Sequence, residues 1–233
     1  MTLHADFFAH DGLRFRTFEA GRGTPIVFLH GGGSRARNFH QMMELLASRF
    51  RVLALDLRGF GETGASAARP ITHQIWADDV GAMLDHFKLE KANLVGWSLG
   101  ATVALNFASQ YGARVDRMAL LGAPHPDRPT NRALFEKRLS IIANGGTAAD
   151  VVDATFAGIA QALSPWVLQH RPEALEQVRQ EHLSHDVTLA AKVVDGYATR
   201  PDLNALLPKV RCPVTLIVGD ADRTCDLAGA REL

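Results

Sequence analysis

A serine stands between two glycines in Gly96-Trp97-Ser98-Leu99-Gly100, directly after the apolar run 92–95 and before residues 101–111, which are expected to form a buried helix. This pattern predicts a sharp strand-to-helix turn with Ser98 at its tip. The turn leaves no room for a Cβ where the helix closes back on the strand, and the serine itself must accept strained dihedral angles. Because a lone serine hydroxyl is a poor nucleophile, the motif also requires a base, an acid and donors for an oxyanion.

Short apolar runs alternate with amphipathic stretches along much of the chain. Such alternation is typical of an α/β protein, so we predict a doubly wound, mostly parallel sheet with helices on both faces. An Asp11-Gly12 pair between two apolar segments predicts a two-residue hairpin turn. The expected strands are residues 7–10, 13–18, 25–29, 52–55, 92–95, 118–121 and 214–218, and the expected helices are residues 38–50, 71–87 and 101–111.

The alternation stops after residue 121, and residues 125–207 show only helical patterning interrupted by prolines. Structureless loops of this length are rare, so we expect a helical cap over residues 127–207, inserted into a core of residues 1–126 and 208–233. Its aromatic residues either line a substrate pocket or form the core of the cap. Two histidines are expected on a solvated helix face, because no third ligand stands at a spacing suitable for a metal. These residues are Phe135, Phe156, Trp166, Tyr197, His182 and His185.

The composition argues against several classes of function. The 233 residues include 25 Lys+Arg and 25 Asp+Glu, and a net charge of zero argues against nucleic-acid or anionic-membrane partners. Residues 1–10 lack the basic segment of a secretory signal, and no apolar run approaches the roughly 18 residues of a membrane span. Cys212 and Cys225 flank a predicted strand, which separates them too far for an unstrained disulfide unless the chain folds back. We therefore expect a cytoplasmic protein.

A second glycine-rich element, His30-Gly31-Gly32-Gly33, ends the strand predicted over residues 25–29. Glycines at this place expose backbone N–H groups that can stabilise an oxyanion. We expect the N–H groups of Leu99 and Gly32 to do so, with Gly33 as a substitute for Gly32. His30 is expected to form structural hydrogen bonds at the end of the strand. The alternative for the three glycines alone is a flexible connection between a strand and a helix.

The Gly-x-Gly-x-x-Gly pattern of residues 59–64 is not interpreted as a dinucleotide-binding turn. That motif must open a helix directly, so that a pyrophosphate meets the helix N-terminus. Here small residues and Pro70 follow instead. We expect a loop near the entrance of the site, with Asp56 and Arg58 in structural contacts.

Four segments, residues 28–33, 56–61, 96–100 and 219–222, together resemble the α/β-hydrolase superfamily. The resemblance extends from Leu3 to Leu233 and is to the branch of 3-oxoadipate enol-lactonases, bacterial esterases and hydrolases of ring-cleavage products. It implies hydrolysis of a small carboxylic ester or lactone through an acyl-Ser98 intermediate, with Asp222 rather than Asp220 as the acid and with no metal or organic cofactor. Hydrolysis of a C–C bond is the alternative reaction. A simple turn aspartate is the alternative for Asp222.

The catalytic histidine of the superfamily follows one further strand after the acid, and no histidine follows Asp222 in this chain. We interpret this as a C-terminal truncation that removes the last strand, the last helix and the base. The alternative is a remodelled triad in which His125 substitutes. A truncated chain could also be a non-catalytic fragment or binding protein. We further expect self-association through the exposed sheet edge at residues 214–218.

Overall fold

The computed structural model describes residues 2–66, 69–124, 132–160, 163–184, 186, 189, 192–193, 196–197, 199–222, 225 and 227–233. These residues contain a seven-stranded sheet of order β1-β2-β4-β3-β5-β6-β7. The pairs β1–β2 and β2–β4 are antiparallel and the remaining neighbours are parallel, which confirms the predicted mostly parallel sheet. The strands are β1 (His4–His10), β2 (Leu13–Ala20), β3 (Pro25–Leu29), β4 (Arg51–Leu55), β5 (Ala92–Trp97), β6 (Val115–Leu121) and β7 (Val214–Ile217).

The predicted hairpin joins β1 to β2, with His10 opposite Leu13. Its two turn residues, Asp11 and Gly12, both have positive φ angles, of 52° and 72°. Positive φ at both central positions is the mark of a type I′ turn, whose twist matches that of the flanking strands. Aspartate followed by glycine is therefore the local cause of the hairpin.

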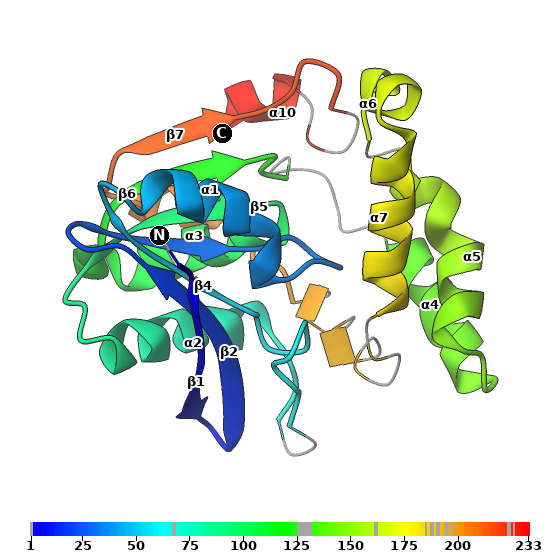
Figure 1. Ribbon diagram of the computed structural model, residues 1–233, viewed down its shortest axis with the longest axis horizontal. Helices are drawn as coiled ribbons and strands as arrows, with labels where there is room; N and C mark the ends of the chain where they lie inside the picture. Colours follow the sequence, from blue (N-terminus) through cyan, green and yellow to red (C-terminus); the bar gives the residue numbers. More distant parts are fainter. Residues whose placement is uncertain are drawn as a thin grey trace.

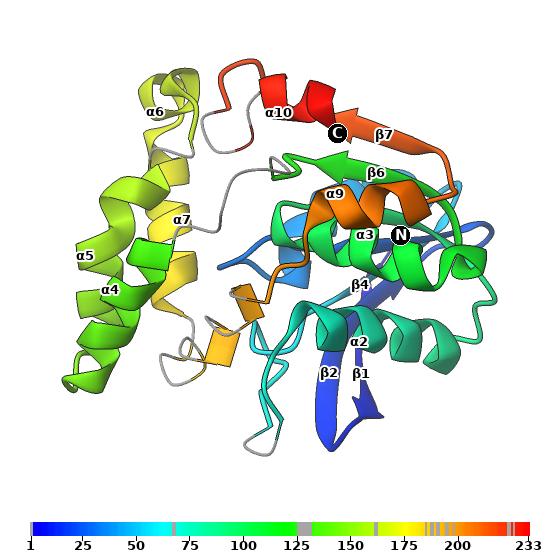
Figure 2. The ribbon, with the colours of Figure 1, turned by 180° about the vertical axis from the view of Figure 1, so that it is seen from behind.

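Helices cover both faces of the sheet (Figures 1 and 2). Successive residues of a strand point to opposite faces, and in β3 Val27 joins the core cluster that contains residues of α2 and α3, whereas Phe28 joins the cluster that contains residues of α1. Burial on both faces explains why these strands are continuous apolar runs. The helices are α1 (His40–Leu46), which follows a 3₁₀ turn (Ala36–Phe39), α2 (His73–His86) and α3 (Leu99–Gln110).

Between β6 and β7 the chain forms a separate helical layer, defined here as α4–α7. In both views this layer stands beyond the ends to which the arrows of β6 and β7 point (Figures 1 and 2). The short α9 instead contacts α3, with Leu203 and Leu206 buried in the main core. No helix within the described residues is long and apolar enough to cross a membrane. The helices are α4 (Arg132–Ala143), α5 (Ala148–Ala160), α6 (Pro165–His170), α7 (Pro172–Leu183), α9 (Leu203–Leu206) and α10 (Leu227–Glu232).

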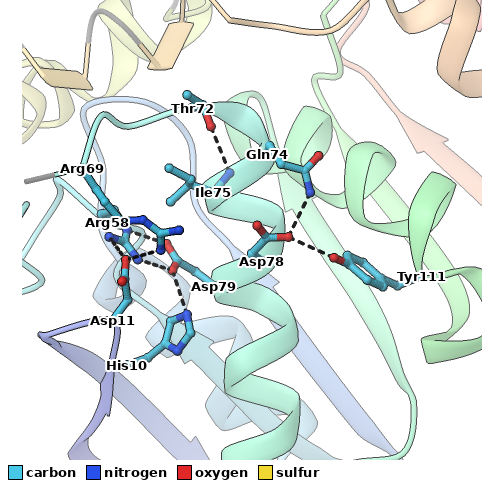
Figure 3. A network of polar contacts seen from close by, with 10 residues as sticks. All are labelled: His10, Asp11, Arg58, Arg69, Thr72, Gln74, Ile75, Asp78, Asp79 and Tyr111. Carbon is cyan, nitrogen blue, oxygen red and sulfur yellow. Dashed lines mark hydrogen bonds and ion pairs between the residues drawn. The ribbon is translucent and has the colours of Figure 1, made fainter.

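Arg58 is completely buried in the loop after β4 and binds two carboxylates (Figure 3). Its Nε and Nη2 donate to Asp79 Oδ2 and Oδ1 at 2.9 and 2.6 Å, and its Nη1 donates to Asp11 Oδ2 at 2.8 Å. Asp79 lies on α2 and is completely buried, whereas Asp11 lies in the hairpin turn. The guanidinium thus joins the hairpin, the loop and α2, which confirms the structural contacts predicted for Arg58.

Asp56 organises the same loop through its carboxylate. Its Oδ1 accepts the N–H of Ala36 at 2.7 Å, and its Oδ2 accepts the N–H of Glu62 at 2.8 Å. A Cβ on Gly61, whose φ is 55°, would overlap with this carboxylate. The segment from Gly59 to Gly64 is a loop that does not open a helix, as predicted.

Replacing Arg58 by alanine is expected to lower the free energy of unfolding by about 3–5 kcal/mol, because the carboxylate of Asp79 would stay buried without its partner. Urea unfolding followed by circular dichroism measures this loss. The control is Lys91→Ala, which removes an ion pair to Asp116 from a lysine side chain that is 55% exposed. That variant is expected to lose less than about 1 kcal/mol. An equally small loss in Arg58→Ala would contradict the proposed contribution of the buried ion pair between Arg58 and Asp79 to the free energy of unfolding.

β7 is the last strand in the sheet order and exposes apolar side chains: Val214 is 41% and Ile217 51% exposed. Unpaired backbone groups beside exposed apolar side chains favour association between sheet edges. We expect the protein to self-associate at this edge, and Ile217→Lys to weaken the association, measured by light scattering over a concentration series. The control is Leu45→Lys, at an exposed leucine of α1. A monodisperse monomer of the unaltered protein would refute the expectation.

Candidate active site

Ser98 joins β5 to α3 in a backbone conformation that residues other than glycine rarely adopt. Its φ and ψ are 51° and −109°, a strained combination that costs on the order of 1–3 kcal/mol. Its N–H donates to the carbonyl of Leu121 in β6 at 2.9 Å, and its own carbonyl accepts the N–H groups of Ala101 and Thr102 at 3.0 and 3.3 Å. The neighbouring strand and the first turn of the helix therefore hold the strained residue in place.

The two glycines around Ser98 allow α3 to approach the sheet. A Cβ on Gly96 would lie 2.5 Å from the carbonyl oxygen of Gly100 and 2.7 Å from Cα of Ala101. A Cβ on Gly100 would overlap with the carbonyl oxygen of Leu29 in β3. This confirms the sequence-based expectation that the turn has no room for side chains at either position.

Two segments that carry candidate oxyanion donors lie beside Ser98. Leu99 is the first residue of α3, and the first N–H groups of a helix have no intrahelical partner and lie at its positive end. The glycine loop, residues 31–33, runs alongside, since a Cβ on Gly31 would lie 3.4 Å from Cβ of Ser98. The two residues predicted to bind an oxyanion, Leu99 and Gly32, thus belong to segments that meet at the serine.

His30 is completely buried, and both of its ring nitrogens contact the backbone. The N–H of Leu57 donates to Nε2 at 2.9 Å, and Nδ1 lies 2.7 Å from the carbonyl oxygen of Gly31. Since Nε2 accepts and a carbonyl can only accept, Nδ1 carries the proton and donates it to Gly31. The ring fixes the start of the glycine loop, which confirms the structural hydrogen bonding predicted for His30.

Asp222 lies just beyond β7, at the same edge of the sheet as Ser98. Its Oδ2 is 3.5 Å from the place that a Cβ on Gly122 would occupy. Gly122 directly follows Leu121, whose carbonyl accepts the N–H of Ser98. The Oδ1 of Asp222 also accepts the N–H of Cys225 at 2.9 Å. Asp220, the neighbour considered from sequence, is exposed.

Two side chains from the segment between β6 and β7 lie against the glycine loop. A Cβ on Gly32 would overlap with the hydroxyl of Tyr197 and lie 2.7 Å from its Cζ. A Cβ on Gly33, whose φ is 69°, would lie 2.6 Å from Nε2 of His182. Glycine at these positions therefore leaves room for two polar groups, a phenol and an imidazole.

Arg35 ties α7 to the loop that follows these glycines. Its guanidinium contacts the carboxylate of Glu181 and the hydroxyl of Ser184, on either side of His182. The Nδ1 of His182 donates to the carbonyl of Val178 at 2.8 Å, and burial lowers the pKa of this imidazole. The prediction that His182 lies on a solvated helix face is wrong, because α7 turns this face toward the glycine loop.

The family model described as "alpha/beta hydrolase fold" matches residues 24–144, which include the glycine loop and Ser98. The chain belongs to the alpha/beta hydrolase family. The chain is 30% identical over 218 residues to a pimeloyl-(acyl-carrier protein) methyl ester esterase of Chromobacterium violaceum, with 91% of this chain and 82% of that protein covered. It is 32% identical over 126 residues to a 2-hydroxymuconate semialdehyde hydrolase of a Pseudomonas species. That match covers 53% of this chain and 44% of the relative, less than half of its length.

Solved structures agree with this assignment. A thermophilic esterase from Thermogutta terrifontis superposes with a TM-score of 0.84 and 27% identity, covering 100% of this chain and 85% of that chain. An enol-lactonase from Burkholderia xenovorans LB400 has the same fold, with a TM-score of 0.85, 22% identity, and coverage of 97% and 86%. The similarity in fold therefore includes the segment between β6 and β7.

The remaining residues singled out from sequence are dispersed. Trp166 is 62% exposed and stacks on His170, with ring centroids 4.6 Å apart. His125, His185 and the side chain of Phe135 lie outside the described residues. Among those that the structure describes, no group of three His, Cys, Asp or Glu side chains is placed to hold a metal, and Cys212 and Cys225 are not joined in a disulfide.

His73, at the start of α2, connects the site to the core and was not identified from sequence. Its Nδ1 donates to the carbonyl of Gly196 at 2.8 Å, and its Nε2 lies 3.0 Å from Oγ1 of Thr102. The single hydroxyl proton of Thr102 is shared between this nitrogen and the carbonyl of Leu99, which lies 2.8 Å from Oγ1. Burial lowers the pKa of His73 to about 4, so the ring is neutral at pH 7. No local pattern marks this histidine, because its partners are distant in sequence.

Acidification is expected to destabilise the protein through His73. Its folded-state pKa of about 4 lies below the ordinary value of 6.5, so the unfolded chain takes up a proton first. The contribution of neutral His73 to the free energy of unfolding is complete above pH 6.5 and is lost as the pH falls to about 4. It amounts to up to about 3 kcal/mol. Urea unfolding at pH 7 and pH 4.5 measures this loss.

His73→Asn replaces the imidazole by an amide that does not titrate, and should reduce the dependence on pH. The control is His4→Asn, at an exposed histidine of β1, which should leave the dependence unchanged. If the free energy of unfolding of the unaltered protein and of His73→Asn changed equally between pH 7 and pH 4.5, the attribution of the pH dependence to His73 would be refuted.

Proposed function

We propose that this alpha/beta hydrolase cleaves a small carboxylic ester or lactone through an acyl-Ser98 intermediate. The observation that carries the proposal is the strained turn at Ser98, with a φ of 51°, beside a loop of three glycines. The Ser98 oxygen attacks the carbonyl carbon, and the alkoxide of the ester leaves as an alcohol after taking up a proton. Water then attacks the acyl group, releasing the acid and restoring the Ser98 hydroxyl.

The N–H groups of Leu99 and Gly32 are the donors that we assign to the oxyanion in both steps. Donors held by the backbone are already oriented before the reaction, which makes them effective at stabilising the charge that develops on the carbonyl oxygen. Asp222 is assigned the role of the acid that orients a catalytic imidazole. Its position at the sheet edge of Ser98 supports this role.

The base that takes the Ser98 proton has no candidate among the core histidines. His30 and His73 are both buried, and the ring nitrogen without a proton is occupied in each. Nε2 of His30 accepts the N–H of Leu57, and Nε2 of His73 lies 3.0 Å from Oγ1 of Thr102. No histidine follows Asp222 in the sequence, and His125 lies outside the described residues. A chain that lacks this base is expected to retain, from the oxyanion donors and substrate binding, a rate roughly 10³–10⁴-fold above that in water.

We assign residues 127–207 as a cap over a core of residues 1–126 and 208–233, and small molecules as the substrates. The contacts of Tyr197 and His182 with the glycine loop support this division. A second candidate reaction is C–C bond hydrolysis of a ring-cleavage product with the same residues. It is favoured by the 32% identity to the 2-hydroxymuconate semialdehyde hydrolase.

Hydrolysis of p-nitrophenyl acetate by the 233-residue chain tests the role of Ser98. We expect slow turnover above background and its loss in Ser98→Ala, because the nucleophile is removed. Ser109→Ala, which alters a serine of α3 bound to the carbonyl of Asn106, is the control and should retain the rate. Turnover that persists in Ser98→Ala would refute the proposal. Fast turnover that disappears in Ser98→Ala would instead point to His125 as the base, to be tested by His125→Ala.

A further inference from the structure

The hydroxyl of Tyr197 lies against Gly32, whose N–H is proposed to bind the oxyanion. Only glycine leaves room for it there, since a Cβ would overlap with the hydroxyl. The adjacent Gly31 approaches the nucleophile, with a Cβ at that position lying 3.4 Å from Cβ of Ser98. The Tyr197 hydroxyl therefore contacts Gly32, and the neighbouring residue of the loop, Gly31, lies beside Ser98.

We propose that Tyr197 is a catalytic residue of this hydrolase, whose hydroxyl donates a third hydrogen bond to the oxyanion beside the N–H groups of Leu99 and Gly32. The inference rests on the proposed function, because it concerns the same reaction at Ser98. When the Ser98 oxygen adds to the carbonyl carbon, the carbonyl π electrons move onto the carbonyl oxygen. A hydrogen bond to that oxygen strengthens as its charge grows and so lowers the barrier. Tyr197 keeps its own proton throughout.

The environment of the phenol suits a donor. Burial raises the pKa of Tyr197, against the opposing positive charge of Arg138, so the hydroxyl stays protonated at neutral pH. The ring meets Trp76 edge-on, with centroids 6.2 Å apart and an interplanar angle of 72°. Trp76 is completely buried, and its Nε1 donates to the carbonyl of Arg58 at 2.9 Å. A fixed aromatic neighbour thus limits the movement of the phenol.

The residue before Tyr197 is held by the core through His73. The carbonyl of Gly196 accepts the Nδ1–H of His73 and the hydroxyl of Thr199, both at 2.8 Å, and Oγ1 of Thr199 accepts the N–H of His73 at 3.2 Å. These three hydrogen bonds form a closed ring. His73 is therefore assigned as a positioning residue that acts through Gly196 on Tyr197.

The test is the rate at which a fluorophosphonate labels Ser98, since phosphonylation also places an anionic oxygen at the oxyanion site. Tyr197→Phe removes one hydroxyl and is expected to slow labelling by about 10²-fold. The control is Tyr111→Phe, at the only other tyrosine of the chain, whose hydroxyl donates to Asp78 at 3.0 Å (Figure 3). Labelling of Tyr111→Phe should proceed at the rate of the unaltered protein. Peptide mass spectrometry identifies the labelled serine.

An unchanged labelling rate in folded Tyr197→Phe, with Ser98 labelled in the unaltered protein, overturns the role of Tyr197 and leaves the proposed function standing. Failure to label Ser98 in the unaltered protein, over an incubation long enough for the slow reaction expected of a chain without a base, overturns the proposed function itself. If Tyr197→Phe does not fold, the His73 variants decide. His73→Asn keeps a donor within reach of Gly196 and should label near the normal rate, whereas His73→Ala should be at least roughly 10-fold slower. Equal rates for these two variants overturn the role of Tyr197.

Discussion

The contact between α3 and the sheet is the constraint on which the site depends. Gly100 lies against the carbonyl of Leu29 in β3, while Gly96 lies against the first turn of α3. With the helix seated on two neighbouring strands, the connecting residue is forced into the positive-φ conformation observed at Ser98. The same contact brings the start of α3 next to the glycine loop after β3, where a Cβ on Gly31 would lie 3.4 Å from Cβ of Ser98. A side chain at either glycine would move all of these groups together.

Features that depend on a few adjacent residues were predictable from the sequence. Apolar runs located the strands because strands covered on both faces admit few polar residues. The Asp11-Gly12 pair predicted a turn through positive φ angles, and the glycines around Ser98 predicted a turn that has no room for a Cβ. Asp222 was assigned from the resemblance to the superfamily, in which the acid follows the strand after the cap. The predicted helix 38–50 was less accurate, since the structure forms a 3₁₀ turn followed by the shorter α1.

Contacts between distant segments were not predictable in this way. His73 meets Gly196 across 123 positions of sequence, and nothing in the spacing of a single histidine indicates such a partner. The contact of Tyr197 with the glycine loop also escaped detection, because its aromatic ring suited either a pocket or a hydrophobic core. For His182, helical spacing shows which residues share a face but not which segment covers that face. Long-range packing therefore determines which polar groups reach the site.

The Tyr197 hydroxyl occupies the place that a side chain at position 32 would need. The residue types at positions 32 and 197 therefore constrain each other. An alanine at position 32 would collide with the present phenol, whereas the same alanine could be accommodated beside a shorter residue at position 197. Substitutions at the two positions are therefore expected to be non-additive. A change of substrate range through these two positions would require paired replacements. A side chain at position 32 becomes acceptable only after Tyr197 has been replaced by a shorter residue.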